Sequence, residues 1–393
     1  MKEPIKNFLN NNLILLLVLS IILRILVVIF TPFLGDIVNT YKLGEGIFEN
    51  AKIYSDQLPY PPPIYYYVAF IFYISKLTHI PFLYLYKLLP LLSDIAILIL
   101  LYKHLKNKTT VLLYAYNPVI ILVSSAFGKE EPYVILIVLL SYLSFAKRKL
   151  VSALLLSTSI CIKAFPVLLV PSFIQKISSI KSKLLFFLLT TIPVSALVVP
   201  FLFINYDGIS QNYLNYSGMA DYGWGAIVKT ISAIWSGNSI NFSPFASNLH
   251  GILTVTKFLY LVVLGILFFV SSIKKNFLLL KLIIFIFLLF YIIHGGIGTN
   301  FLYWVFPFLL LYNAKVAFSY TFFSTFAVIG YLLTQFYHPV LRHISFVLFA
   351  TPIYTNILYL ISLLLFYGYL FYLFIYVWKN NSSDLNTYKQ YIL

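Results

Sequence analysis

The chain has 393 residues, of which 61% are hydrophobic and only 10% carry a charge, whereas about 25% of the residues of a typical soluble domain are charged. Apolar runs of about 18 or more residues recur from one end of the sequence to the other, a pattern typical of membrane-spanning helices. These two properties exclude an ordinary soluble protein and predict an all-α, polytopic membrane protein.

The formal net charge is +16, and in a soluble protein such an excess would suggest a nucleic-acid partner. Here the lysine and arginine residues form short clusters between apolar runs, at residues 103–108, 147–149 and 274–275 among others. Such clusters are typical of cytoplasmic loops beside transmembrane helices. The sequence therefore predicts a lipid bilayer as partner and no nucleic acid.

The single cysteine, Cys161, lies in an apolar run, so we expect no intramolecular disulfide and no cysteine metal cluster. Lys2 and Lys6 precede the first apolar run, residues 13–30, and no small-residue cleavage site follows it. This pattern predicts a first helix that is retained in the mature protein, with the N-terminus in the cytoplasm.

The first predicted span runs from about Asn11 to Thr31, and residues 32–81 form the first external loop. The aromatic segment Pro61–Ser75 of this loop admits two interpretations. If it crossed the membrane, the basic cluster at residues 103–108 would fall on the outer face. If it lies along the outer surface as an interfacial helix, the later basic clusters all fall inside. We prefer the interfacial helix, because tyrosine is enriched at membrane–water interfaces.

The remaining apolar runs predict further spans, and the whole chain about twelve, within a range of about 10 to 13. We expect Leu150–Ile162 and Phe165–Ile174 to form a hairpin of short helices with Lys163 at its external tip. The expected segments are about Phe82–Tyr102, Val111–Ala126, Tyr133–Ala146, Leu150–Ile162, Phe165–Ile174, Leu184–Phe203, Leu253–Val270, Phe277–Ile293, Phe301–Tyr312, Val316–Thr334 and Asn356–Val377.

Residues 204–251 are expected to form a second external loop with short surface helices, and residues 379–393 a cytoplasmic tail. The sequence thus predicts one transmembrane domain over residues 1–378. It contains no G-x-x-x-x-G-K-[ST] phosphate-binding loop, so ATP-driven transport by this chain alone is not expected.

Three polar positions at the ends of predicted helices are candidates for chemistry. Asp36 follows the first helix, where a carboxylate can act as a general base or be a solvated acid. Glu130 and Glu131 form an external turn, where they could share a cation, hydrogen-bond a sugar or only provide a polar turn. Lys163 could bind a lipid phosphate or extend to the headgroup region.

Two more candidates lie within or beside apolar runs. Asp94 is inside the predicted helix Phe82–Tyr102, where an acid usually faces the bundle interior and has a partner, so a structural role is the alternative. His294 and the Tyr303-Trp304 pair lie at an external helix junction, where an interfacial role is the simpler interpretation.

A series of short motifs occurs in a particular order, and together they carry a family resemblance. They are Gly35-Asp36, Tyr60-Pro61-Pro62, Lys87-Leu88-Leu89-Pro90 with Asp94, Asn117-Pro118 with Ser124-Ser125, Gly128-Lys129-Glu130-Glu131, and Lys163 with Pro166 and Pro171. Over about the first 175 residues the chain resembles the C-type (GT-C fold) integral membrane glycosyltransferases, in particular the polyprenyl-phosphate-sugar-dependent, mannosyltransferase-like families. Two departures are Glu131, where Asp is commoner, and Lys129, where Gln is usual.

The resemblance implies a GT-C-like fold and the transfer of a single sugar, a mannose-like hexose or a pentose, from a polyprenyl-phosphate donor to a lipid, glycan or protein acceptor. It implies Asp36 as the base of an inverting displacement, Lys163 as a ligand of the donor phosphate and Glu130 or Glu131 as a second acid. The implied substrate pocket contains Tyr60, Asp94, His294 and Tyr303. No metal site or further cofactor is indicated, although a divalent cation is compatible with the chemistry.

Two other functions remain open from the sequence, a transporter or flippase of lipid-linked sugars and a non-catalytic scaffold subunit. A transporter should have charged or broken helices near the membrane midplane, whereas the acids here are concentrated in the outer loops. We therefore expect a transferase that acts at the extracytoplasmic face, in the plasma membrane of a prokaryote or the endoplasmic reticulum of a eukaryote, with both termini cytoplasmic.

Overall fold

The computed structural model describes residues 11–31, 37–50, 60–105, 107–204, 206–210, 221–237, 240, 247–273, 277–335 and 352–380. Within these ranges the secondary structure is helical, apart from one isolated antiparallel bridge between Tyr222 and Ile297. The prediction of an all-α chain is confirmed. The chain divides into two compact units, which lie within residues 1–216 and 217–383, and each is described by itself. That residues 1–378 act as one domain stays a prediction.

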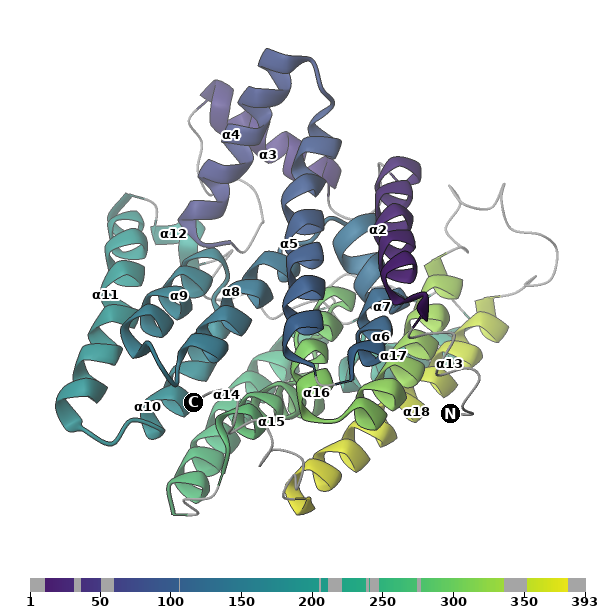
Figure 1. Ribbon diagram of the computed structural model, residues 1–393. Helices are drawn as coiled ribbons and strands as arrows, with labels where there is room; N and C mark the ends of the chain where they lie inside the picture. Colours follow the sequence, from purple (N-terminus) through teal and green to yellow (C-terminus); the bar gives the residue numbers. More distant parts are fainter. Residues whose placement is uncertain are drawn as a thin grey trace. The chain divides into compact units, whose positions relative to one another are not determined.

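The helices of the first unit agree with most of the predicted segments (Figure 1). They are α2 (Leu13–Phe30), α3 (Ile37–Asn50), α4 (Pro62–Thr78), α5 (Phe82–His104), η1 (Lys108–Val111), α6 (Leu112–Ala115), α7 (Pro118–Ile121), η2 (Leu122–Ala126), α8 (Glu131–Ser144), α9 (Lys149–Ile162), η3 (Phe165–Leu169), α10 (Val170–Gln175), α11 (Ile180–Ile204) and α12 (Tyr206–Ile209).

The segment between α2 and α4 contains a helix, α3, that the sequence pattern does not predict. Helix α3 packs against α4, and the two lie together beyond one end of α5 (Figure 1). A Cβ atom at Gly44 of α3 would lie only 3.1 Å from the Phe72 side chain and 3.2 Å from Val68 of α4. The helices meet this closely because Gly44 has no side chain. The sequence predicts only a loop before Pro59, and the structure corrects this, because Ile37–Asn50 form a helix.

The predicted span Val111–Ala126 is not one helix. It is broken between α6 and α7, and the two halves are bent by 52°. The break lies at Asn117-Pro118, since proline has no backbone N–H to continue the helical ladder. The second half ends as a π-helix, η2. The predicted short helix Phe165–Ile174 is likewise divided, into a 3₁₀ turn and α10.

The second unit contains the remaining long helices. Helices α17 and α13 pack against α18, and α15, which is buried along most of its length, also contacts α18. The helices are α13 (Trp224–Ser236), α14 (Ser247–Ile273), α15 (Leu279–Ile293), η5 (Thr299–Tyr303), α16 (Phe306–Tyr312), α17 (Ala314–Gln335) and α18 (Pro352–Lys379).

Six of the described helices are long and apolar enough to cross a membrane, or seven spans if the bent pair counts as one. The six are Leu13–Phe30, Phe82–His104, Ile180–Phe203, Val255–Ile273, Ala314–Thr334 and Ile353–Lys379. Large apolar side chains such as Phe187, Phe258 and Phe269 are exposed on them, as expected for surfaces that contact lipid. The protein is an integral membrane protein.

Candidate functional site: an acid pair and a lysine

Two adjacent glutamates begin helix α8. Gly128 turns the chain with a φ of +61°, which favours glycine, and Glu130 and Glu131 occupy the N-cap and first position of the helix. Carboxylates at a helix N-terminus are stabilised by the unsatisfied N–H groups and the helix dipole. The predicted external turn is nevertheless not a solvated one, because only 2% of Glu130 is exposed and Glu131 is completely buried.

Lys163, at the end of helix α9, carries the opposite charge. It caps the C-terminus of α9 in an extended conformation, and α9 packs against α8. Its Nζ donates a short hydrogen bond to Oε1 of Glu131 and lies 3.6 Å from Oε2 of Glu130. Lys163 retains 16% exposure of its side chain, so the edge of this ion cluster reaches the surface of the unit.

Tyrosine side chains surround the acid pair. The Tyr86 hydroxyl of α5 donates a 2.7 Å hydrogen bond to Oε1 of Glu130, and the Lys163 ammonium lies 5.9 Å from the centre of the Tyr60 ring. The rings of Tyr67 and Tyr133 are 6.4 Å apart. The Tyr133 hydroxyl is buried and has no hydrogen-bond partner in the described part of the chain, so it can still bond to a ligand.

The electrostatic environment keeps Glu130 ionised. Burial raises the pKa of the Glu130 carboxyl, but the Lys163 and Lys129 charges and the Tyr86 hydroxyl outweigh burial, so that this pKa lies below its usual value. Burial and the Glu130 charge both raise the pKa of the Tyr67 phenol. The ionised Glu130 thus lies beside Glu131 and Lys163, and neutral phenols around this cluster can hydrogen-bond a hydroxylated ligand.

The structure brings together four of the residues that the sequence singled out: Tyr60, Glu130, Glu131 and Lys163. Asp36, the predicted base, lies outside the described residues. Among the other acids of the first loop, Glu45 is half-buried and Glu49 is exposed.

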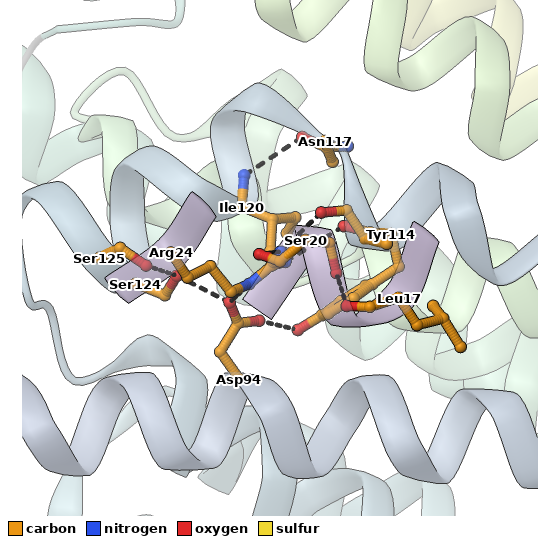
Figure 2. A network of polar contacts seen from close by, with 10 residues as sticks. Leu17, Ser20, Arg24, Asp94, Tyr114, Asn117, Ile120, Ser124 and Ser125 are labelled. Atoms are coloured by element: carbon orange, nitrogen blue, oxygen red, sulfur yellow. Dashed lines mark hydrogen bonds and ion pairs between the residues drawn. The ribbon is translucent and has the colours of Figure 1, made fainter. Parts of the chain in front are cut away.

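Asp94 lies in the first unit but has internal partners that occupy both carboxylate oxygens. It accepts hydrogen bonds from Arg24 Nε at 2.8 Å, from the Ser124 hydroxyl at 2.8 Å and from the Tyr114 hydroxyl. Asp94 and Arg24 are both completely buried. Figure 2 shows Arg24 of α2 between the α5 carboxylate and the chain around Tyr114. Of the two interpretations given for Asp94, this geometry favours the structural one.

His294 and Tyr303 belong to the second unit. His294 caps the C-terminus of α15, stacks on Phe290 at 4.7 Å, and accepts a 3.1 Å hydrogen bond from the Gly296 N–H at Nδ1. Burial lowers its pKa to about 4, and the Lys257 charge acts in the same direction. The neutral ring can therefore offer only its Nε2–H as a donor. Tyr303 is fully buried in η5.

Sequence reasoning missed Arg24, Tyr86 and Lys87. A signal for Arg24 was available, because it is the sole charged residue in Leu13–Phe30 and a charge within a membrane helix marks a structural or functional partner. Lys87, completely buried in α5, was noted only as part of a motif. Tyr86 carries no signal, since tyrosine is abundant throughout the chain.

Within the described ranges, no three His, Cys, Asp or Glu side chains come together in a group that could hold a metal ion. The two glutamates contact Lys163.

No protein-family model matches the chain, and no curated protein matches it in sequence.

Proposed function

We propose that the protein is a membrane glycosyltransferase that moves one sugar from a polyprenyl-phosphate donor to an acceptor at the extracytoplasmic face. The observation that carries this proposal is the buried cluster of Glu130, Glu131 and Lys163 beside Tyr60. Charged groups are costly inside a membrane protein and usually mark a functional site. Here the charged groups lie where the Tyr60 motif, the N-terminus of α8 and the C-terminus of α9 meet.

The donor makes two chemical demands that these residue types meet. Its leaving phosphate needs a cation as negative charge develops, for which Lys163 is the candidate because its side chain is partly exposed. Its sugar hydroxyls need hydrogen-bond partners and an aromatic face, which carboxylates and tyrosines provide. Glu130 and Glu131 hold the ammonium in place, so that Lys163 meets the phosphate in one fixed position.

Asp36 is the proposed base. In this proposal it removes the proton of the acceptor hydroxyl, whose oxygen attacks the anomeric carbon as the bond to the lipid phosphate breaks. One such displacement inverts the configuration of the sugar. The support for Asp36 is its sequence position beside the first span and the motif that contains it.

A GT-C-like fold with about twelve spans belongs to the same proposal. The six long helices and the bent pair are supplemented by shorter apolar helices, which are Glu131–Ser144, Lys149–Ile162, Phe165–Gln175, Leu279–Ile293 and Thr299–Tyr312. Helices of this length can cross a membrane only where it is thin or where they continue into turns. The interfacial position of α4 and the cytoplasmic position of both termini also remain proposals.

The decisive experiment is transfer of a radiolabelled sugar in reconstituted vesicles supplied with polyprenyl-phosphate mannose, glucose or pentose donors and with lipid, glycan and peptide acceptors. We expect wild-type protein to consume one donor, Asp36→Asn to lose at least about 100-fold in rate, and Glu49→Gln, an exposed acid of the same loop, to keep the wild-type rate. Transfer by Asp36→Asn at the wild-type rate would remove Asp36 as the base. Absence of transfer from every donor class would remove the proposed function.

A flippase of lipid-linked sugars is the second candidate, and one observation favours it. The broken helix of α6 and α7 and the buried Arg24–Asp94 pair beside it are features that transporters place in the membrane interior. The same vesicles separate the two functions. A flippase moves a fluorescent lipid-linked sugar between leaflets and leaves its glycosidic bond intact, whereas a transferase cleaves that bond.

A further inference from the structure

The break in the helix at residues 116–118 leaves backbone carbonyls without their helical partners. In a continuous helix the Tyr114 carbonyl would accept from the N–H of residue 118, but Pro118 has none, and Tyr114 accepts instead from the Asn117 N–H at 3.3 Å. The Ala115 carbonyl would accept from Val119, whose N–H instead donates to Oδ1 of Asn117 at 2.9 Å. Inside a membrane, where water cannot replace them, missing backbone hydrogen bonds are strongly destabilising.

Arg24 supplies replacement hydrogen-bond donors for these carbonyls. Its Nη1 donates to the Ala115 carbonyl at 2.6 Å, and its Nη2 lies 3.4 Å from the Tyr114 carbonyl. The guanidinium of α2 thus bonds the Ala115 carbonyl, whose helical donor is turned towards Asn117, and adds a long second bond to the Tyr114 carbonyl, which also accepts from the Asn117 N–H.

Asp94 joins both halves of the broken helix. Its carboxylate accepts from the Tyr114 hydroxyl, before the break, and from the Ser124 hydroxyl, after it. The same carboxylate neutralises Arg24 through Nε. Figure 2 shows these bonds converging on Asp94 from α2 and from both sides of the break.

Lys87 holds the far end of the second half. Its Nζ donates to the carbonyl of Ala126, the last residue of η2, and to the carbonyl of Thr31, both at 2.5 Å. Gly128 follows two residues after Ala126, and a Cβ atom there would lie only 2.7 Å from Cγ of Lys87. Two residues later the chain reaches Glu130, so the end of the bent helix leads straight into the acid pair.

We propose that Arg24, Asp94 and Lys87 are positioning residues, which hold the broken helix in its bent form and thereby set where Glu130 and Glu131 meet Lys163. The role of the acid pair in sugar transfer rests on the proposed function. The positioning role of Arg24, Asp94 and Lys87 does not rest on the proposed function. It can be tested by measurements that need no substrate.

The first test is a double-mutant cycle on melting temperature in detergent. One background is wild type, and the other is Asn117→Leu/Pro118→Ala, in which the restored N–H groups at residues 118 and 119 can satisfy the carbonyls. We expect Arg24→Met to lower the melting temperature by about 5 °C or more in wild type and by less in the second background, where only the loss of the Asp94 partner remains. Equal losses in both backgrounds would contradict the role assigned to Arg24. Arg24→Lys, which keeps the charge, replaces Arg24→Met in the cycle if that variant does not fold.

The second test measures the acid pair directly through the acylation rate of Lys163 by an amine-reactive acetylating reagent, followed by mass spectrometry. Glu131→Gln gives the reference rate for a lysine released from its strongest partner. We expect Asp94→Asn and Lys87→Met to raise the Lys163 rate towards that reference. Ser141→Ala, which removes another buried hydrogen bond between α8 and α9, should leave it unchanged. Wild-type rates in Asp94→Asn and Lys87→Met would overturn the proposal.

Activity provides the third readout. If the protein transfers sugar, Asp94→Asn is expected to lower kcat/KM by at least about tenfold while the folded fraction stays constant, and Ser141→Ala is expected to keep it. If wild type transfers no sugar, the proposed function fails, and the cycle and the Lys163 acylation rate still decide the positioning roles.

Discussion

Tyr86 donates its hydroxyl hydrogen to Oε1 of Glu130 over 2.7 Å, although the two residues are 44 positions apart in the chain. The bond links α5 to the N-terminus of α8, which pack together. It places a neutral donor on a buried carboxylate whose other oxygen faces Lys163. The acid pair is therefore held from two directions, by a charge and by a phenol.

Tyr86→Phe should raise the pKa of Glu130 and destabilise the protein by about 1–3 kcal/mol, the usual range for a hydrogen bond to a charged group. The measurement is thermal unfolding in detergent at pH 7. Tyr67→Phe is the matched control, because in the described part of the chain the Tyr67 hydroxyl donates only a long hydrogen bond, to the Tyr86 carbonyl at 3.5 Å. If the two variants melt at the same temperature, the Tyr86–Glu130 hydrogen bond contributes no more to stability than the long Tyr67–Tyr86 hydrogen bond.

Glu130 should make the protein less stable in acid. Its pKa is depressed in the folded state, so its contribution is fully present above the unfolded pKa, near 4.5, and is lost as the pH falls through the folded value. Melting curves between pH 7 and pH 3 should therefore decline less steeply for Glu130→Gln than for wild type. Glu49→Gln, at an exposed position, should show the wild-type slope, and a wild-type slope for Glu130→Gln would contradict the assignment.

His294 adds a second acid-sensitive group, in the second unit. Its folded pKa is about 4 and its ordinary value 6.5, so the unfolded chain binds the extra proton between these two pH values. Stability should consequently fall as the pH drops from 6.5 to 4, by up to about 3 kcal/mol. His294→Gln should abolish this part of the decline. His79→Gln is the control, since His79 is exposed beyond the end of α4.

Gly128→Ala should destabilise the protein by about 1–3 kcal/mol, because the positive φ strains an L-residue and the new Cβ would lie 2.7 Å from Cγ of Lys87. Gly46→Ala is the matched control, since a Cβ there meets no atom within 4 Å and alanine favours the helix. Unfolding in detergent measures both. Comparable melting temperatures for the two alanine variants would show that the turn tolerates a side chain.

Much of the helical framework could be predicted from the sequence. The segments expected at Phe82–Tyr102, Leu150–Ile162 and Leu184–Phe203 begin and end within a few residues of α5, α9 and α11, because long apolar runs have one stable arrangement in a bilayer. The predictions are wrong where the hydrophobic pattern is weak or where a proline breaks a helix. Helix α3 is polar enough to resemble a loop, and the break at Asn117-Pro118 lies inside a run that remains apolar throughout.

Part of the candidate site was also predictable. Glu130, Glu131 and Lys163 were singled out because charges are rare in this chain and conspicuous beside apolar runs. The structure places them in contact at the ends of α8 and α9, and their location at the outer face stays a prediction. Asp94 was expected in a substrate pocket or in a structural pair, and only its partner could decide between them.

By itself, the sequence determined that this is a helical membrane protein and which residues carry its rare charges, because the cost of placing polar groups in hydrocarbon acts on each segment separately. Only the tertiary structure decided the pairing of those charges. Arg24 meets Asp94 across 70 positions and Lys163 meets Glu131 across 32. Such partners depend on how helices pack and where one of them breaks, and neither is encoded in the apolar pattern of a single segment.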